Sequence, residues 1–476
     1  MNLLIVVSDT FRWDYIGAYG NEWIETPYLD KLAAESVTFD DAYAEGLPTI
    51  PARRVLMTGR NIVPFAHRHQ LSDGVQLHGW HPLFDEDVTL SEHLRQHDYM
   101  CAFFNDVYHM MKPGKNFHRG FDYWYWIRGQ EGDPFAYLDA EQVSRELGRA
   151  AAGRKLHPRA WVIQHLVNRS AWRSEKDTIV AQTMRTAADW LRGYPLDNPF
   201  YMHVECFDPH EPWDPPVKYA RRYDRTFTRD DALDALIPPG RVEQMTDDQV
   251  RNVQTAYAGE CSLVDRWVGH LLETLDETGH AKDTLVVFTS DHGCMLGEQG
   301  EIHKGQDRLR NQCTRLPLFI RHPRGDGSGQ RVSGFVQHQD IMPTCLELMD
   351  LPTPTRCLGR DAWPMVTGNA RGRQYAVSAF GPYACIRTHK WNYVCPWTGL
   401  PREATPRIEL YDLESDPQEL TNVVGDHPDV AAKLADRLEA HMKRFAPKTT
   451  GSFQSLAAGT ASLSFDALPR FDKGRH

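Results

Sequence analysis

A threonine stands at the start of a predicted helix, in a stretch of polar and apolar residues that spans positions 49–60. The free backbone N–H groups and the positive dipole end of a helix start both favour an anion. Pro51 suits the first turn, because the N–H that proline lacks would have no partner there. The Thr49 hydroxyl therefore stands where a nucleophile could act on an anionic group, although an ordinary helix cap would use the same residue type.

Carboxylates and an imidazole follow two apolar runs that are typical of buried parallel strands. Asp9 comes after residues 3–7, and Asp291 with His292 comes after residues 284–290. Because ligand sites of open α/β sheets lie at the carboxyl ends of the strands, these side chains are predicted to meet at one edge. This donor set can bind a divalent cation and permits Ca²⁺, Mn²⁺, Mg²⁺ or Zn²⁺. Position alone also leaves Asp9 open to a helix-capping role.

The stretch at 49–60 resembles the signature of the sulfatase family, a branch of the alkaline phosphatase superfamily. That signature runs Cys or Ser, any residue, Pro, any residue, Arg, three more residues, and then Leu or Met followed by Thr-Gly. Every defining position is met except the first, which is Thr49. The resemblance extends to about residue 446 and rests also on Asp9, Tyr19-Gly20, Asp208-Pro209-His210-Glu211-Pro212, Asp291-His292-Gly293, Lys304, and residues 338–344 and 416–422.

The departure at position 49 decides what the resemblance implies for chemistry. In the family the leading Cys or Ser is oxidised to formylglycine, whose hydrate attacks sulfur. Thr49 cannot follow this route, because its β-carbon carries a methyl group, so no formylglycine is expected. The resemblance implies one divalent metal ion, in the first place Ca²⁺ or Mn²⁺, with Asp9, Asp291, His292, Thr49 and Thr10 as ligands, Thr10 standing at the family's second Asp.

Catalytic and substrate-binding residues are implied by the same resemblance. Thr49, Arg53, His210 and Lys304 are expected to be catalytic, with Arg53 orienting Thr49 and the other two on the transferred group.

Three further residues are candidates for substrate contacts. Where the family keeps Gly-Lys-Trp-His, with its Lys on the sulfate, this chain has Asn-Asp-Val-Tyr-His at 105–109. Asp106 therefore either selects the substrate or lies in a loop that has moved, and His109 is an alternative polar contact. Arg128 belongs to a polar turn that could line the pocket.

The surrounding elements predict an α/β fold. Continuous apolar runs alternate with helical periodicity, and alternation typical of antiparallel strands begins beyond about residue 370. The resemblance implies a large mixed, mostly parallel sheet sandwiched by helices, with a smaller C-terminal antiparallel sheet plus a helix. The expected division is a catalytic domain at 1–370 with a basic insert at about 122–176, a small α+β subdomain at 371–446, and a tail at 447–476 that could be an oligomerisation arm.

Composition narrows the classes of partner and compartment. The 476-residue chain has a formal net charge of -11, which argues against a general nucleic-acid binder. No apolar run approaches the roughly 20 residues that span a bilayer, and no leader precedes the first predicted strand. The nine cysteines are scattered singly, as in reduced cytoplasmic proteins. The expected partners are a small anionic ester and a second copy of the chain in a homo-oligomer, with neither nucleic acid nor membrane.

Three functions remain open. The first is metal-dependent hydrolysis of phosphate or phosphonate esters, of diester or monoester type, with Thr49 as nucleophile. Thr has this role in phosphodiesterases and phosphoethanolamine transferases of the wider superfamily, which the chain resembles. The second is sulfate ester hydrolysis, with Thr49 acting directly or standing where a native Cys or Ser was replaced. The third is a binding protein without catalysis, which the intact set of other site residues disfavours.

Overall fold

Eight strands form the central sheet in the part of the chain that the computed structural model describes, residues 1–66, 75, 77–137, 141, 145, 160–236, 240–398 and 405–452. In spatial order they are β13 (Arg331–Val332), β2 (Val37–Phe39), β12 (Leu318–Arg321), β8 (Thr284–Ser290), β1 (Asn2–Ser8), β7 (Phe200–Cys206), β5 (Met100–Asn105) and β6 (Tyr123–Trp126). β1 pairs in parallel with β7 and β8, and β5 pairs in parallel with β7 and β6. Because β12 runs antiparallel to β8 and β2, the sheet is mixed and mostly parallel, as expected.

The three central strands end level with one another. Every residue of β1, β7 and β8 is buried, which explains their continuous apolar runs. The register pairs Ser8 with both Cys206 and Ser290, the last residues of the two neighbouring strands. Asp9 and Asp291 therefore leave the sheet side by side, and the chain after β7 leaves beside them.

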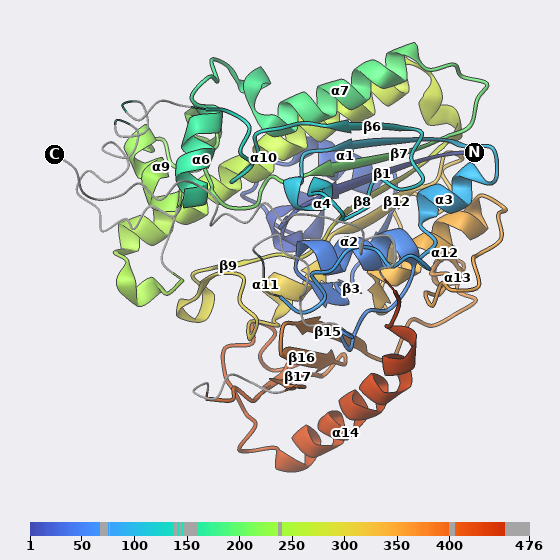
Figure 1. Ribbon diagram of the computed structural model, residues 1–476. Helices are drawn as coiled ribbons and strands as arrows, with labels where there is room; N and C mark the ends of the chain where they lie inside the picture. Colours follow the sequence, from blue (N-terminus) through green and yellow to red (C-terminus); the bar gives the residue numbers. More distant parts are fainter. Residues whose placement is uncertain are drawn as a thin grey trace.

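Helices cover both faces of the sheet (Figure 1), and each face has its own hydrophobic core. Leu4 and Val6 of β1 belong to one core, whereas Leu3, Ile5 and Val7 belong to the other, as the alternation along a strand requires. The first core is covered by α1 (Pro27–Ala34), α7 (Ile179–Gly193) and α10 (Asp247–Glu277), and the second by α2 (Thr49–Thr58), α3 (Leu90–Arg95) and α12 (His338–Leu348).

A second sheet joins the end of the chain to an early segment. β4 (Gly46–Leu47) precedes α2 in the chain and pairs in parallel with β15 (Ala376–Phe380). Helix α14 (Pro428–Phe445) packs on this sheet through Ala431, Leu434 and Leu438. The expected fold class, including the small sheet with its helix, is confirmed, while the division at residue 370 stays a prediction. In spatial order, the five strands of this second sheet are β18 (Glu409–Asp412), β17 (Trp391–Pro396), β16 (Tyr383–Arg387), β15 and β4.

The predicted insert and tail are described in part. Most of the insert between 138 and 159, and the tail from 453 onward, lie outside the described residues. The predicted amphipathic helix of the insert is present as α6 (Ala160–Arg169), whose Val162 and Leu166 contact Leu236. The remaining short elements are α4 (Tyr108–Met111), α8 (Val217–Ala220), α9 (Arg229–Leu236), α11 (Asn311–Thr314), α13 (Trp363–Val366), β3 (Ala42–Tyr43), β9 (Met295–Leu296), β10 (Ile302–His303), β11 (Arg315–Leu316) and β14 (Val336–Gln337).

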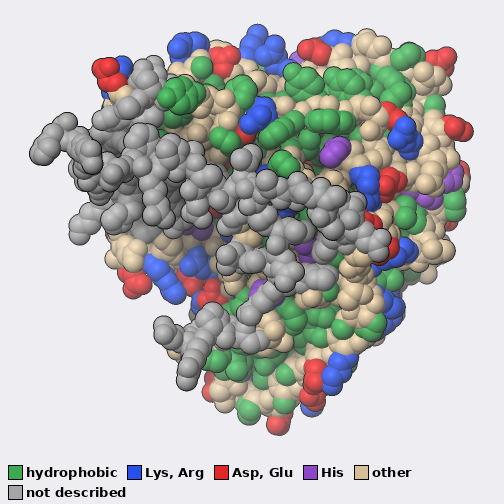
Figure 2. Space-filling view, in the orientation of Figure 1, with side chains coloured by type: hydrophobic (Ala, Val, Ile, Leu, Met, Phe, Trp, Pro, Cys, Tyr) green, Lys and Arg blue, Asp and Glu red, His purple; other side chains and the backbone are tan. Residues whose placement is uncertain are grey.

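The surface carries both signs of charge. On the face shown in Figure 2, Lys and Arg side chains lie interspersed with Asp and Glu along the outline. None of the described helices is long and apolar enough to cross a membrane. All nine cysteines lie in the described part of the chain and are free, and seven of them are buried.

Candidate active site

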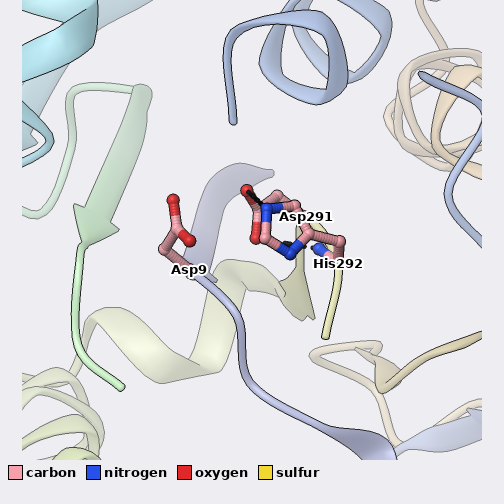
Figure 3. A group of neighbouring side chains, drawn as sticks. All are labelled: Asp9, Asp291 and His292. Atoms are coloured by element: carbon pink, nitrogen blue, oxygen red, sulfur yellow. Dashed lines mark hydrogen bonds and ion pairs between the residues drawn. The ribbon is translucent and has the colours of Figure 1, made fainter. Parts of the chain in front are cut away.

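Three potential metal ligands meet where β1 and β8 end, and Figure 3 draws them together. Asp9 comes directly after β1, and Asp291 and His292 come directly after β8. One oxygen or nitrogen of each side chain lies within 4.8 Å of those of the other two. All three residues are buried, with at most 2% of their surface exposed. The structure thus brings together the trio that the sequence placed at one edge of the sheet.

The cluster has the donor atoms that a divalent cation requires. His292 donates from Nδ1 to the Gly293 carbonyl at 2.9 Å, and its Nε2 has no hydrogen-bond partner among the described residues. Burial lowers the pKa of His292 to about 3, so the ring is neutral and Nε2 carries a lone pair. Asp9 Oδ2 also receives no hydrogen bond from the described chain, although Arg53 lies 2.9 Å away. Buried oxygen and nitrogen atoms that accept no hydrogen bond from the described residues fit a divalent metal ion.

Asp9 and Asp291 share the charge of one arginine. Arg53 of α2 places Nη1 2.9 Å from Asp9 Oδ2 and in contact with Asp291 Oδ2. Burial raises the pKa of Asp291 to about 8, whereas at Asp9 burial is outweighed by the charge of Arg53, which lowers the pKa. A bound cation would add positive charge beside both carboxylates and would compete with protons for them.

Thr10 holds both carboxylates in place. Its backbone N–H donates to Asp291 Oδ1 at 2.9 Å, and its hydroxyl donates to Asp9 Oδ1 at 2.7 Å. Thr10 has a φ of 61°, in the left-handed region that β-branched residues rarely adopt and that costs about 1–3 kcal/mol. The observed role of Thr10 is to orient the two carboxylates, and its role as a direct metal ligand stays a prediction.

Thr49 is the first residue of α2 and lies one turn before Arg53. Residues four positions apart share a helix face, so the threonine lies on the face that carries Arg53 to the buried carboxylates. Thr49 is 2% exposed, and its hydroxyl makes no hydrogen bond within the described part of the chain. The cap position is Pro48, so the alternative of a capping threonine does not apply. The hydroxyl therefore takes no part in the hydrogen bonds that hold the described structure together.

The end of α2 explains the Thr-Gly part of the signature. Gly59 ends the helix with a φ of 62°, and its N–H donates to the Val55 carbonyl at 2.9 Å. A Cβ at Gly59 would lie 2.4 Å from Cys357 Sγ, so glycine is required both for conformation and for space. Thr58 donates from its hydroxyl to the carbonyl one turn earlier, at Arg54, at 2.6 Å. These two residues shape the helix end and do not touch the metal cluster.

Lys304 and His210 contact each other, and their expected roles on the transferred group stay predictions. Lys304 Nζ donates to His210 Nε2 at 2.5 Å and to Glu211 Oε1 at 3.2 Å. His210 donates from Nδ1 to the Glu211 carbonyl at 2.6 Å, and burial lowers the pKa of its ring, so the neutral ring can accept from the ammonium. Burial opposes the charge of Lys304, but the carboxylates of Glu211 and Asp9 outweigh it and raise the pKa. The ammonium is therefore held in the field of the metal cluster.

Sequence reasoning missed a buried polar chain on β7. Tyr201 Oη lies 2.7 Å from His203 Nδ1, and His203 Nε2 lies 2.9 Å from Glu205 Oε1. The other carboxylate oxygen of Glu205 accepts from Arg53 Nη2 at 3.0 Å and from Nε at 3.1 Å. The three residues stand at alternate positions of a strand and so point to the same face. Polar residues at this spacing in an otherwise apolar strand are the signal that could have revealed them.

Asp106, a predicted substrate contact, is bonded inside the protein. One carboxylate oxygen accepts from Thr183 Oγ1 at 2.7 Å, and the other accepts from the Phe207 N–H at 2.6 Å. Asp106 is 1% exposed, and burial raises its pKa well above the usual value. Its position fixes the start of the segment that carries His210, and it is not among the residues that gather at the metal cluster.

The other two predicted substrate contacts, His109 and Arg128, each pair with an acidic residue of the turn at 128–133. His109 Nε2 lies 3.2 Å from Glu131 Oε2, and Arg128 binds Asp133 through two hydrogen bonds of 2.6 and 2.7 Å. Burial raises the pKa of Glu131, and the charge of His210 acts against that shift. Glu131 is therefore a further acidic group close to His210 and Lys304, and the substrate contacts of His109 and Arg128 stay predictions.

A surface cavity of about 660 Å³ lies apart from this cluster. It is bordered by α6, α8 and α9, and Asp214 in its wall pairs with His165 at 3.0 Å. None of the three metal-ligand candidates, nor Thr49 or Lys304, lines it. The cavity is therefore separate from the buried cluster.

Comparisons with known proteins agree with this geometry. The model of the sulfatase family matches residues 1–351, and that of the N-sulphoglucosamine sulphohydrolase C-terminal region matches residues 300–446. An arylsulfatase of Clostridium perfringens is 26% identical over 468 residues, which cover 89% of this chain and 90% of the relative. A multifunctional alkaline phosphatase superfamily protein, PehA of Trinickia caryophylli, is 25% identical, with 91% and 93% covered.

Solved structures show the same fold. The phosphonate monoester hydrolase of Agrobacterium radiobacter superposes with a TM-score of 0.69 at 22% identity, covering 93% of this chain and 96% of that protein. The sulfatase match extends over well over half of the chain and includes β1, α2, β7 and β8, the elements that carry the cluster. The chain therefore belongs to the sulfatase family, a family of hydrolases that act on sulfuric or phosphoric esters.

Proposed function

We propose that this protein hydrolyses phosphate or phosphonate esters, of the diester or monoester type, with Thr49 as nucleophile. The observation that carries the proposal is the buried Thr49 hydroxyl, which makes no hydrogen bond within the described residues and lies one turn before Arg53. A free hydroxyl at a helix start is placed where negative charge is stabilised. It can attack a tetrahedral, anionic centre once its proton is made more acidic.

The cofactor is a single divalent cation, with Ca²⁺ or Mn²⁺ as the first candidates and Mg²⁺ or Zn²⁺ as further ones. Asp9, Asp291 and His292 would hold it, because their donor atoms lie within 4.8 Å of one another. When bound, such an ion supplies positive charge that lowers the pKa of a nearby hydroxyl and neutralises the oxygens of the transferred group.

The reaction proceeds by two successive displacements at phosphorus. First, Thr49 Oγ forms a bond to phosphorus as the bond to the leaving oxygen breaks, and the hydroxyl proton passes to solvent. Lys304 and His210 meet the charge that builds up on the non-bridging oxygens, or give a proton to the leaving oxygen. A water oxygen then bonds to phosphorus, the bond to Thr49 breaks, and the threonine regains its proton.

The side chain at position 49 favours phosphorus over sulfur. A formylglycine hydrate expels sulfate by elimination as its second hydroxyl becomes the aldehyde, and a threonine ester has no such route because its β-carbon carries no second hydroxyl. A phosphothreonine is resolved by attack of water at phosphorus and needs no elimination. The threonine therefore suits a phosphorus ester, in agreement with the role of threonine expected from the wider superfamily.

Sulfate ester hydrolysis is the second candidate. The family model and the arylsulfatase relative favour it, since both carry that activity in their names. A binding protein without catalysis is a weaker third candidate, because Arg53, His210 and Lys304 are present beside the metal-ligand trio. The ester is expected to be small and anionic. A homo-oligomer in the cytoplasm, where free cysteines persist, completes the proposal.

The test is a screen of aryl esters that share one leaving group. The metal-loaded protein is assayed on the aryl sulfate, phosphate monoester, phosphate diester and phosphonate monoester. We expect the phosphorus esters to be cleaved faster than the sulfate, Thr49→Ala to lose the activity, and Thr49→Ser to keep part of it. Mass spectrometry of quenched reactions should find phosphate or phosphonate on the peptide that contains Thr49.

The opposite ranking would overturn the proposal. If the unmodified protein cleaves the sulfate faster than every phosphorus ester, the sulfatase hypothesis is the correct one. Thr49→Cys, produced together with a formylglycine-generating enzyme, provides a matched comparison, because it should shift the preference towards the sulfate.

A further inference from the structure

Glu211 sits against the two groups that are expected to meet the transferred group. Its carboxylate oxygens lie 3.2 and 3.4 Å from Lys304 Nζ, and Oε1 lies 3.6 Å from His303 Nδ1. Its backbone carbonyl accepts from His210 Nδ1 at 2.6 Å. The side chains of Glu211 and Lys304 are each 14% exposed, so solvent screens the pair only weakly.

Glu211 reduces what Lys304 can offer to an anion. An ammonium has three N–H donors, and Lys304 directs donors to both Glu211 and His210. One N–H is left for a substrate oxygen, and the charge of the ammonium is already offset by the adjacent carboxylate. Burial raises the pKa of Glu211, but the positive charge beside its carboxylate outweighs burial and holds the pKa well below the usual value, so the carboxylate stays ionised.

The charges around the site are close to balance. Arg53 and Lys304 supply two positive charges, and a divalent cation would supply two more. Five carboxylates face them: Asp9 and Asp291 at the metal-ligand cluster, Glu205 on Arg53, Glu211 on Lys304, and Glu131 close to His210. A site without a large positive surplus binds one negative charge more readily than two.

We infer that Glu211 is a specificity-determining residue that makes the site select singly charged esters over doubly charged ones. This inference rests on ester hydrolysis at the proposed site. Phosphate diesters, phosphonate monoesters and sulfate monoesters carry one negative charge, whereas a phosphate monoester above about pH 7 carries two. The favoured substrates therefore share their charge, and the atom at the centre of the ester is a separate question.

The experiment compares esters of different charge in the metal-loaded protein at about pH 8. The ratio of kcat/KM for an aryl phosphate monoester to that for the aryl methyl phosphate diester is measured in the native protein and in Glu211→Gln. One unit charge at about 7 Å, with an effective dielectric constant of about 20, changes this ratio by roughly tenfold to fiftyfold. We expect the ratio to rise by that factor in Glu211→Gln. A general loss of rate through misplaced Lys304 would cancel in the ratio.

Two variants separate charge from geometry. Glu211→Asp keeps the charge and shortens the side chain, so its ratio should stay within about threefold of the native value. Glu175→Gln removes a carboxylate that is 17% exposed and also pairs with a lysine, Lys218, but lies outside the metal cluster. It should leave the ratio unchanged.

A binding measurement covers the case in which turnover is too slow. Phenylphosphonate, which carries two charges, and its monomethyl ester, which carries one, are titrated by calorimetry into Thr49→Ala and into Thr49→Ala with Glu211→Gln. We expect the second protein to gain at least tenfold in relative affinity for phenylphosphonate.

An unchanged ratio in both measurements, or an equal rise in Glu211→Asp, would overturn the inference. The outcome is independent of the choice between sulfur and phosphorus. An aryl sulfate serves as a second singly charged ester, so the same ratio can be formed with it if the phosphorus esters prove to be poor substrates. The native protein could cleave the sulfate fastest while the kcat/KM ratio of the doubly charged to the singly charged ester still rises in Glu211→Gln. That result would refute the proposed function and support the role of Glu211.

Discussion

Replacing Arg53 with methionine should separate the stability of the fold from the affinity for a cation. Arg53 is fully buried, and its guanidinium contacts Asp9, Asp291 and Glu205. At 2.9 Å, the distance to Asp9, one such pair is worth roughly 6 kcal/mol at an effective dielectric constant of about 20, before desolvation is subtracted. Loss of one partner of a buried pair costs about 3–5 kcal/mol, because the other charge stays buried without its counter-charge.

We therefore expect Arg53→Met to lower the free energy of unfolding by about 3–5 kcal/mol in the presence of a chelator. A bound divalent cation replaces the missing positive charge, so the loss should shrink by about half or more at saturating Ca²⁺ or Mn²⁺. A cation at a hundredfold excess over its Kd adds about 2.7 kcal/mol of stability. Its affinity should rise in the variant, because a positive charge 2.9 Å from a ligand oxygen has been removed. Urea unfolding with and without metal, and calorimetric titration of the metal, measure the two effects.

Arg310→Met is the matched control. Arg310 is also buried, and it binds Glu301 and Glu409. It therefore links the part of the chain around the eight-stranded sheet to the small C-terminal sheet. Its replacement should cost a similar free energy of unfolding, and metal should not restore it. The reasoning about Arg53 is refuted if Arg53→Met loses as much stability with saturating cation as with chelator and binds the cation no more tightly than the native protein.

Two further predictions concern catalysis and acid stability. Lys304→Ala should lower kcat/KM about a hundredfold to a thousandfold, because its ammonium meets charge that develops in the transition state, and unchanged turnover would remove Lys304 from the mechanism. Burial lowers the pKa of His441 from 6.5 to about 4, so the unfolded chain binds more protons between these values and stability is lost as pH falls from about 6.5 to 4. His441→Leu should reduce the slope of the unfolding free energy over that range by up to about 1.4 kcal/mol per pH unit. If urea unfolding gives the same slope of the unfolding free energy against pH for the native protein and for His441→Leu, the buried neutral ring is contradicted.

The metal-ligand trio was predictable because it depends on strand ends. The apolar runs before Asp9 and Asp291 indicate buried parallel strands, and such strands deliver the next residues of the chain to a common edge. The register that pairs Ser8 with Ser290 makes this placement concrete. Local sequence carries the information, since the side chains come directly after the elements that position them.

The partners of the cationic residues were not predictable in the same way. Glu205 meets Arg53 across 152 positions of the chain, and Lys304 meets His210 across 94. These contacts depend on how α2 packs against β7 and on how the segment after β10 folds back, and no local pattern encodes either. The same limit applies to Asp106, for which the sequence left open a substrate-selecting role or a loop that has moved: the motif position was visible, and the bond to Thr183 was not.

The small C-terminal sheet contributes to the position of Thr49 although it carries no residue of the metal-ligand trio. β4 pairs with β15 through Gly46 and Leu47, and the Ala379 N–H donates to the Glu45 carbonyl at 2.9 Å. The segment that leads into α2 is therefore held as an edge strand of that sheet. The far end of α2 is held from another direction, where Gly59 packs against Cys357. With both ends fixed by later parts of the chain, α2 keeps its Arg53 face against the strand ends, so the position of Thr49 depends on the two sheets together.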